Sequence, residues 1–185
     1  MKKPFIMLMM SSCLLSTPSI AQVVVNDPVA TSQAVITCGN ARFTVLTPEM
    51  IRVEYSEQAK FEDRATFTIV NRKLDAPQFT KSEDDTYLYI TTSNLKLKYR
   101  KGTDPRTLPA SPSNLTITIS GNGVSSVWYP GKPDPLNLKG TSRTLDGLMG
   151  ESKRAEMENG LVSRSGWAVI DDSWASPRSD GGRSY

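Results

Sequence analysis

The chain has 185 residues, 38% hydrophobic and 22% charged, and this length and balance predict one globular domain. Histidine is absent, which excludes histidine-based triads, histidine–zinc sites and imidazole acid–base chemistry within the chain. The formal net charge is only +3, and no cluster of Lys and Arg predicts a nucleic-acid-binding face.

Residues 1–21 have the pattern of a secretory signal peptide. Two lysines precede an apolar run that is too short and too often interrupted to span a membrane. Small residues then occupy positions −3 and −1 of a cleavage site before Gln22. We therefore predict an exported protein, periplasmic or extracellular. A buried N-terminal helix is the alternative, but it leaves the cleavage motif unexplained.

Cleavage of the signal peptide changes the charge and the cysteine count. Two of the 22 basic residues are lost, so 20 remain against 19 acidic residues and the mature chain is close to neutral. Cys13 is also lost, which leaves Cys38 without an intramolecular disulfide partner. The mature domain must therefore rely on its hydrophobic core, and its length suffices to bury roughly two-thirds of its unfolded surface.

Alternation of apolar and polar residues predicts antiparallel strands through most of the domain. In residues 50–55, Ile51, Val53 and Tyr55 share one face, and the residues between them take the other. The glycines of residues 121–123 suit a tight hairpin turn. The predicted strands are 42–46 and 50–55, a strand in 64–71, a hairpin with strands 87–91 and 95–99, a hairpin over 115–130, and a last strand over 162–171.

Short strands joined by polar turns, without a long helical pattern, predict an all-β fold. An antiparallel β-sandwich explains this pattern better than parallel βαβ units. Residues 129–151 are rich in proline and glycine and lack the strand period. Because long irregular loops in compact domains are usually functional, we expect this loop to bind a ligand or a partner.

Asp171 and Asp172 are adjacent carboxylates, the groups that most glycosidases use in pairs. Neighbouring residues of an extended strand point to opposite faces, so the two cannot flank one scissile bond. We expect one carboxylate to cap a turn and the other to reach a basic or ligand group. Neither this pair nor the tail has the spaced oxygens of a calcium loop, so no metal site is predicted.

Arg143 and Asp146 lie three residues apart in the irregular loop. Guanidinium and carboxylate groups bind the vicinal hydroxyls of sugars well, but the two could equally form a salt bridge with each other.

Three aromatic residues could either bind a sugar or belong to the hydrophobic core: Trp128, Tyr129 and Trp167. Aromatic faces stack on sugar rings, yet tryptophans in alternating strands usually belong to the core, and we expect this of Trp167.

Three segments together resemble the N-terminal region of family 31 glycoside hydrolases, the α-glucosidase and α-xylosidase family. They are "ARFTVLTPEMIRVEYS", "NLKGTSRTLDG" and "ENGLVSRSGWAVIDDS", and the likeness extends over residues 34–185. It implies a galactose-mutarotase-like β-sandwich over residues 22–173, packed against a (β/α)8 barrel that carries the two catalytic aspartates of a retaining mechanism. This chain has no segment like the nucleophile motif of that barrel, so residues 174–185 are expected to be a linker toward an absent barrel.

The resemblance implies the N-terminal domain of an exported α-glycosidase, inactive alone, without a cofactor. It implies that Asp146 contacts an α-linked oligosaccharide or polysaccharide in the −1 subsite, with Arg143 in support. It gives a structural role at the junction with the barrel to Arg164, Trp167, Asp171 and Asp172.

Two alternatives from other classes stay open. The chain could be a free-standing secreted carbohydrate-binding module without hydrolase activity, as its aromatic residues and polar loop would allow. It could also be an exported adhesin or structural domain, which the composition does not distinguish.

Overall fold

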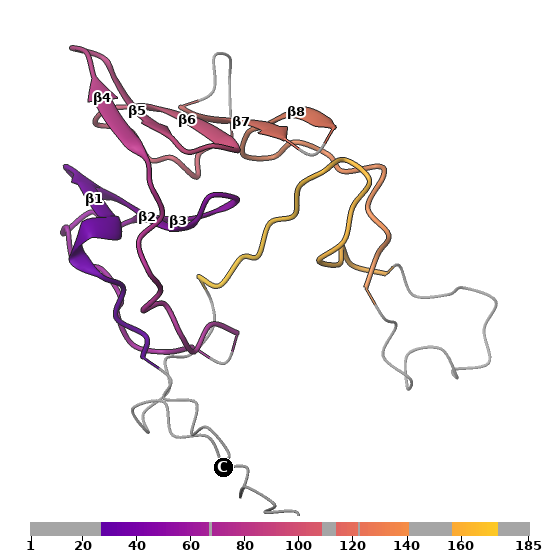
Figure 1. Cartoon of the computed structure of the whole chain (residues 1–185), viewed down its shortest axis with the longest axis horizontal. Helices are drawn as coiled ribbons and strands as arrows, with labels where there is room; N and C mark the ends of the chain where they lie inside the picture. Colours follow the sequence, from indigo (N-terminus) through magenta and orange to yellow (C-terminus); the bar gives the residue numbers. More distant parts are fainter. Residues whose placement is uncertain (1–26, 67, 109–113, 122, 141–156, 174–185) are drawn as a thin grey trace, which may run out of the picture.

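The computed structural model describes residues 27–66, 68–108, 114–121, 123–140 and 157–173. This part of the chain is all-β and folds into two antiparallel sheets, with one short 3-10 helix, η1 (Ser32–Ala34), and no α-helix. The signal peptide and the predicted linker 174–185 lie outside the described residues. The all-β prediction is confirmed, and the two sheets face each other in Figure 1.

The three-stranded sheet has the order β1-β2-β3, and the five-stranded sheet has the order β4-β5-β6-β7-β8. Neighbouring strands follow one another along the chain, so each sheet is a simple meander. The strands are β1 (Val35–Cys38), β2 (Ala41–Thr47), β3 (Met50–Tyr55), β4 (Thr80–Glu83), β5 (Tyr87–Thr91), β6 (Leu95–Arg100), β7 (Leu115–Gly121) and β8 (Val124–Trp128).

One hydrophobic core joins the two sheets. The rings of Phe43 on β2 and Tyr99 on β6 lie 5.0 Å apart between centroids, and both residues are fully buried. As the alternation predicts, the apolar face of β3 packs against this core. The buried members of the core are Ile36, Ala41, Phe43, Val45, Leu88, Ile90, Leu97, Tyr99 and Leu115.

The opposite face of the three-stranded sheet carries charges and is nevertheless covered. Arg42 donates from Nε and Nη2 to the two carboxylate oxygens of Glu54, at 2.7 and 2.9 Å, and its Nη1 lies 2.7 Å from Asp63. Arg52 approaches Glu54 to 2.9 Å, and both arginines donate to the carbonyl of Glu62. The arginines therefore fix the segment that follows β3 across the sheet.

The strand predicted in residues 64–71 is wrong. In the described part of this segment, Thr66 donates its amide to the carbonyl of Ile69 and accepts the amide of Ile69 on its hydroxyl. Arg72 then donates its amide to the carbonyl of Asp27. Among the described residues of this segment only Thr66 lies in a β-bridge and no strand forms, so the segment is an irregular cover over the charged face.

The strand predicted over 162–171 is also wrong. Of this segment only Ser163 forms a bridge, to Asn137, and the chain then turns at Gly166, whose φ is +78°. Conversely, β1 and β4 were not predicted. Each has four residues, and the sequence of β4, Thr-Lys-Ser-Glu, contains no apolar residue that could reveal the strand period.

The Phe43–Tyr99 contact predicts which substitutions unfold the domain. Phe43→Ala removes a fully buried ring and should lower the free energy of unfolding by about 3–5 kcal/mol. Met50→Ala, at a half-exposed position on the adjacent strand, should change it by less than about 1 kcal/mol. Urea unfolding measures both, and equal losses for the two variants would contradict a core centred on Phe43.

Candidate functional site

After β8 the chain leaves the five-stranded sheet, and we call residues 129–140 and 157–173 the arm (orange to yellow in Figure 1). Its two segments run antiparallel. The amide of Leu138 donates to the carbonyl of Val162 at 3.0 Å, and that of Arg164 donates to Leu136 at 3.1 Å. The paired segments flank residues 141–156, so the predicted sugar contacts Arg143 and Asp146 lie outside the described residues.

A side-chain lock holds the two segments of the arm together. The amide group of Asn137 accepts the backbone N–H of Gly160 at 2.8 Å and donates to its carbonyl at 3.1 Å. A Cβ at Gly160 would lie 2.5 Å from the carbonyl oxygen of Lys139, which is far closer than real contacts allow. The close approach therefore requires glycine at position 160.

Asp134 also stabilises the pairing of the two arm segments. Its Oδ1 accepts the hydroxyls of Ser165 at 2.6 Å and Ser163 at 2.8 Å, and its Oδ2 accepts the side-chain amide of Asn137 at 3.0 Å. Burial alone would raise the pKa of Asp134, but these three hydrogen bonds outweigh it and lower the pKa. A charged carboxylate thus organises the base of the 141–156 loop at neutral pH.

Of the four arm residues predicted to lie at a junction, Arg164 and Trp167 differ in their surroundings. Arg164 is exposed, and its backbone takes part in the pairing of the arm. Trp167 is half-buried and is not part of the hydrophobic core, contrary to the expectation, whereas Trp128 packs against the core. The ammonium of Lys132 lies 6.0 Å from the Trp167 ring, so this tryptophan packs within the arm.

Asp171 and Asp172 point to different partners. Oδ1 of Asp171 accepts the amide of Ser173 at 3.0 Å and its hydroxyl at 2.6 Å, and these bonds lower the pKa of this exposed aspartate. Oδ2 of Asp172 instead accepts the hydroxyl of Thr66 at 2.7 Å, across 106 residues of sequence. The two carboxylates therefore do not share one site, and Asp172 attaches the end of the arm to the cover of the three-stranded sheet.

A buried arginine lies beneath this attachment. Arg72 is 1% exposed, and its Nη1 donates to the carbonyl of Arg64 at 3.0 Å. Burial lowers its pKa, while Glu54 and Asp172 oppose that shift. Among the described residues, Nε and Nη2 of Arg72 and Oδ1 of Asp172 are buried without a hydrogen bond. Asp172 is thus one of the carboxylates that compensate this buried charge, a role that no sequence motif revealed.

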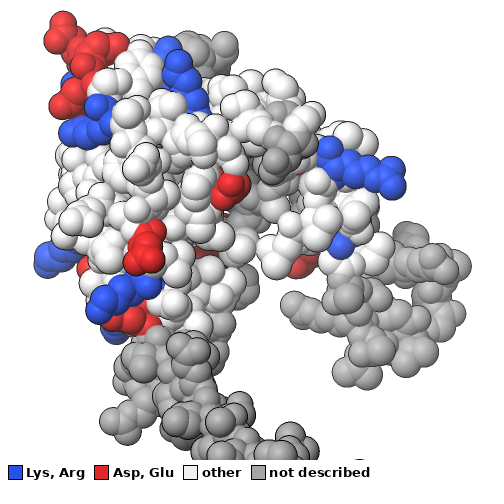
Figure 2. Space-filling model, viewed as in Figure 1, with Lys and Arg blue, Asp and Glu red and all other residues white. Residues whose placement is uncertain are grey.

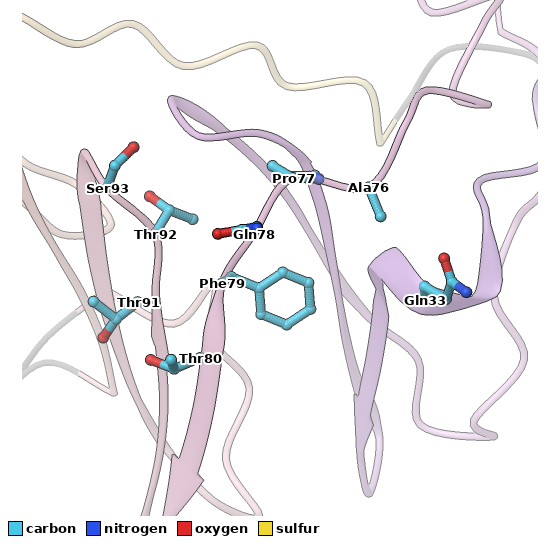
Figure 3. Close-up of a pocket in the computed structure, with 9 residues that line it drawn as sticks. All are labelled: Gln33, Ala76, Pro77, Gln78, Phe79, Thr80, Thr91, Thr92 and Ser93. Carbon is cyan, nitrogen blue, oxygen red and sulfur yellow. The ribbon is translucent and has the colours of Figure 1, made fainter.

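An open cleft lies away from the arm, beside β4, η1 and the turn between β5 and β6 (Figure 3). Its volume is about 760 Å³, and it is open to solvent rather than enclosed. No pattern in the sequence predicts this cleft, because its lining comes from three separate segments. The lining residues are Gln33, Ala76, Pro77, Gln78, Phe79, Thr80, Thr91, Thr92 and Ser93.

The charges on the described surface are mixed in sign on the face drawn in Figure 2. Figure 2 shows acidic and basic side chains in small groups of both signs, without a broad basic face on the side drawn. No three Cys, Asp or Glu side chains of the described residues are placed to hold a metal ion. Within the same residues, no helix is long and apolar enough to cross a membrane.

Comparison with models of known protein families found no match, and a search of curated proteins found no relative. The family 31 resemblance therefore stays a prediction.

The close contact at Gly160 predicts a loss of order in the arm. Gly160→Ala forces the new methyl group against the Lys139 carbonyl and should speed amide exchange at Leu138 and Arg164 by about tenfold or more. Gly140→Ala is the matched control, because its Cβ would meet the nearest atom at an ordinary 3.5 Å. Equal exchange rates in the two variants would disprove the lock.

The different partners of the adjacent aspartates predict different effects of their removal. Asp172→Ala removes the bond to Thr66 and a charge near buried Arg72, and should lower the free energy of unfolding by about 1–3 kcal/mol. Asp171→Ala removes bonds only within its own turn and should cost less. Thermal unfolding of both variants checks this order, and the reverse order would refute the attachment.

Proposed function

We propose that the chain is the N-terminal support domain of an exported α-glycosidase, with the sandwich of the galactose-mutarotase type. It would pack against a retaining catalytic barrel and contribute Asp146, supported by Arg143, to an α-linked oligosaccharide or polysaccharide. The predicted signal peptide, the motifs in the sequence of residues 137–173 and the two packed sheets support this assignment.

The observation that carries the proposal is the apolar surface of the arm. Of the twelve large apolar side chains that are exposed in the described part of the chain, seven lie on the arm. Concentrated apolar exposure of this kind marks protein interaction surfaces. The seven, between 47% and 70% exposed, are Leu136, Leu138, Met157, Leu161, Val162, Val169 and Ile170.

Hydrogen bonds fix the two described segments of the arm that flank the predicted sugar-contacting residues. The base of the arm is fixed by the Asn137–Gly160 lock and by Asp134, and its end is attached through Asp172 to the three-stranded sheet. The apolar arm would bind the barrel, and the loop would then reach the sugar.

Catalysis would belong to the barrel. Asp171 and Asp172 are engaged with Ser173 and Thr66, so they do not form the facing pair of carboxylates that glycoside hydrolysis requires. We therefore assign them, with Arg164 and Trp167, to the structure of the arm and its junction.

A titration tests the loop contact. Maltose and isomaltose, added to the 15N-labelled chain, should shift amide resonances of residues 141–156 in a saturable manner, with dissociation constants in the millimolar range, about 4 kcal/mol of binding. Asp146→Ala should remove the shifts, whereas the control Asp171→Ala should keep them. No shift in this loop with either sugar would overturn the proposed contact.

A further inference from the structure

We infer that β8 is a docking edge at which a second copy of this chain adds its own β8 in antiparallel orientation, and that Lys132 covers this edge in the monomer. β8 is the outermost strand of the five-stranded sheet, at the edge opposite β4 (Figure 1). The inference goes beyond the proposed function and does not depend on it, because β8 is not part of the arm.

The hydrogen-bond register shows which backbone groups of β8 face outward. Ser120 on β7 donates its amide away from β8, to the carbonyl of Asn94 at 2.9 Å. Ser120 is paired with Ser125, so this pair is one that exchanges no hydrogen bonds. Because hydrogen-bonded and non-hydrogen-bonded pairs alternate in an antiparallel ladder, Ser125 and Val127 both direct their N–H and C=O groups to the open side of β8.

The contact of Lys132 agrees with this register. Its ammonium donates to the carbonyl of Val127, which a side chain from the loop after β8 reaches because that carbonyl points away from β7. Among the described residues, no hydrogen bond engages the outward amides of Ser125 and Val127 or the outward carbonyl of Ser125. Lys132 therefore covers the edge at one point, and the rest of it is free to pair.

The two edges of the five-stranded sheet differ in charge. β4 carries exposed Lys81 and Glu83, and Glu83 lies 3.8 Å from both Lys81 and Lys101. Charged side chains on a short edge strand oppose the addition of another strand. β8 contains no charged residue and no proline, and its residues Ser125 and Val127 are exposed. The uncharged edge is therefore the one suited to pairing.

The outward groups of β8 are complementary to themselves. With Ser126 on a two-fold axis, Ser125 of each copy faces Val127 of the other, and each of these pairs exchanges two backbone hydrogen bonds. A closed two-fold dimer of this kind brings no like charges of the strand together, and it is the commonest symmetry of oligomers.

An extended peptide of another protein is the competing occupant. Recognition of a foreign strand depends on pockets for its alternate side chains. The cleft of this sheet lies beside β4, at the opposite edge, so it cannot serve a strand that is added to β8. A second copy, which needs only the matching backbone groups, is therefore favoured.

The test removes the covering ammonium and measures self-association by sedimentation velocity. Lys132→Met should lower the dissociation constant of the dimer by about tenfold or more, because no charge then has to leave the carbonyl of Val127. Lys60→Met, at an exposed position in the turn after β3, is the matched control and should leave the constant unchanged. Amide exchange at Ser125 and Val127 should slow as the protein concentration rises.

Two further substitutions, each made in the Lys132→Met chain, block the edge in different ways. Ser125→Pro removes an outward N–H that β7 does not use, and should abolish association. Val127→Lys returns a charge to the edge without changing the backbone, and should also abolish it. Thermal unfolding of both variants confirms that the fold is kept, and either variant alone suffices for the test.

Three results would overturn the inference. They are equal association of the Lys132→Met and Lys60→Met chains, association that survives a folded blocking variant, and protection of β8 only by an added extended peptide. Association that slows exchange at Leu138 and Val162 but not in β8 would also reject it, and would assign the contact to the apolar arm. None of these results bears on the sugar contact of the proposed function, which the titration of residues 141–156 tests separately.

Discussion

The structure depends on a small sheet that is covered on both faces. Residues 41–46 of β2 are all buried, although every second one faces away from the hydrophobic core. On the core side, Phe43 packs against Tyr99. On the other side, Arg42 is neutralised by Glu54 and Asp63, so a guanidinium can lie under the cover without an unpaired charge.

This arrangement determines where the arm is attached. The cover after β3 is fixed by Arg42 and Arg52 through the carbonyl of Glu62, and the same cover presents Thr66 to Asp172. At its other end, the arm emerges directly from β8. The described arm, residues 129–140 and 157–173, therefore lies beside the two sheets and is held at both of its ends (Figure 1).

Alternation predicted the strands whose two faces differ most. β5 and β6 alternate in burial, and the Gly121 and Gly123 turn has the positive φ angles that its sequence indicates. Residues 64–71 and 162–171 alternate equally well, but their described residues form no strand. Thr66 bonds locally to Ile69, and residues 162–164 pair with residues 136–138 through a single bridge. Residue order alone does not distinguish such short pairings from an extended strand.

The site was predicted less completely than the fold. Asp171 and Asp172 do have different partners, as expected, although the strand on which that expectation rested does not form. The Thr66 and Arg72 partners of Asp172 lie about a hundred residues away, and no local pattern identifies them. The Asn137–Gly160 lock and the cleft around Phe79 likewise join distant segments. Trp167 was assigned to the core from its apolar neighbours, yet those neighbours, Val169 and Ile170, are exposed on the arm.

The most direct test of a support role is amide exchange in the arm, measured with and without a separately produced family 31 catalytic barrel that lacks its own N-terminal domain. If the apolar arm binds such a barrel, exchange at Leu138, Val162 and Val169 should slow by about tenfold or more when the barrel is saturating. Unchanged exchange in the arm, whether the barrel binds another surface or does not bind, would contradict the account.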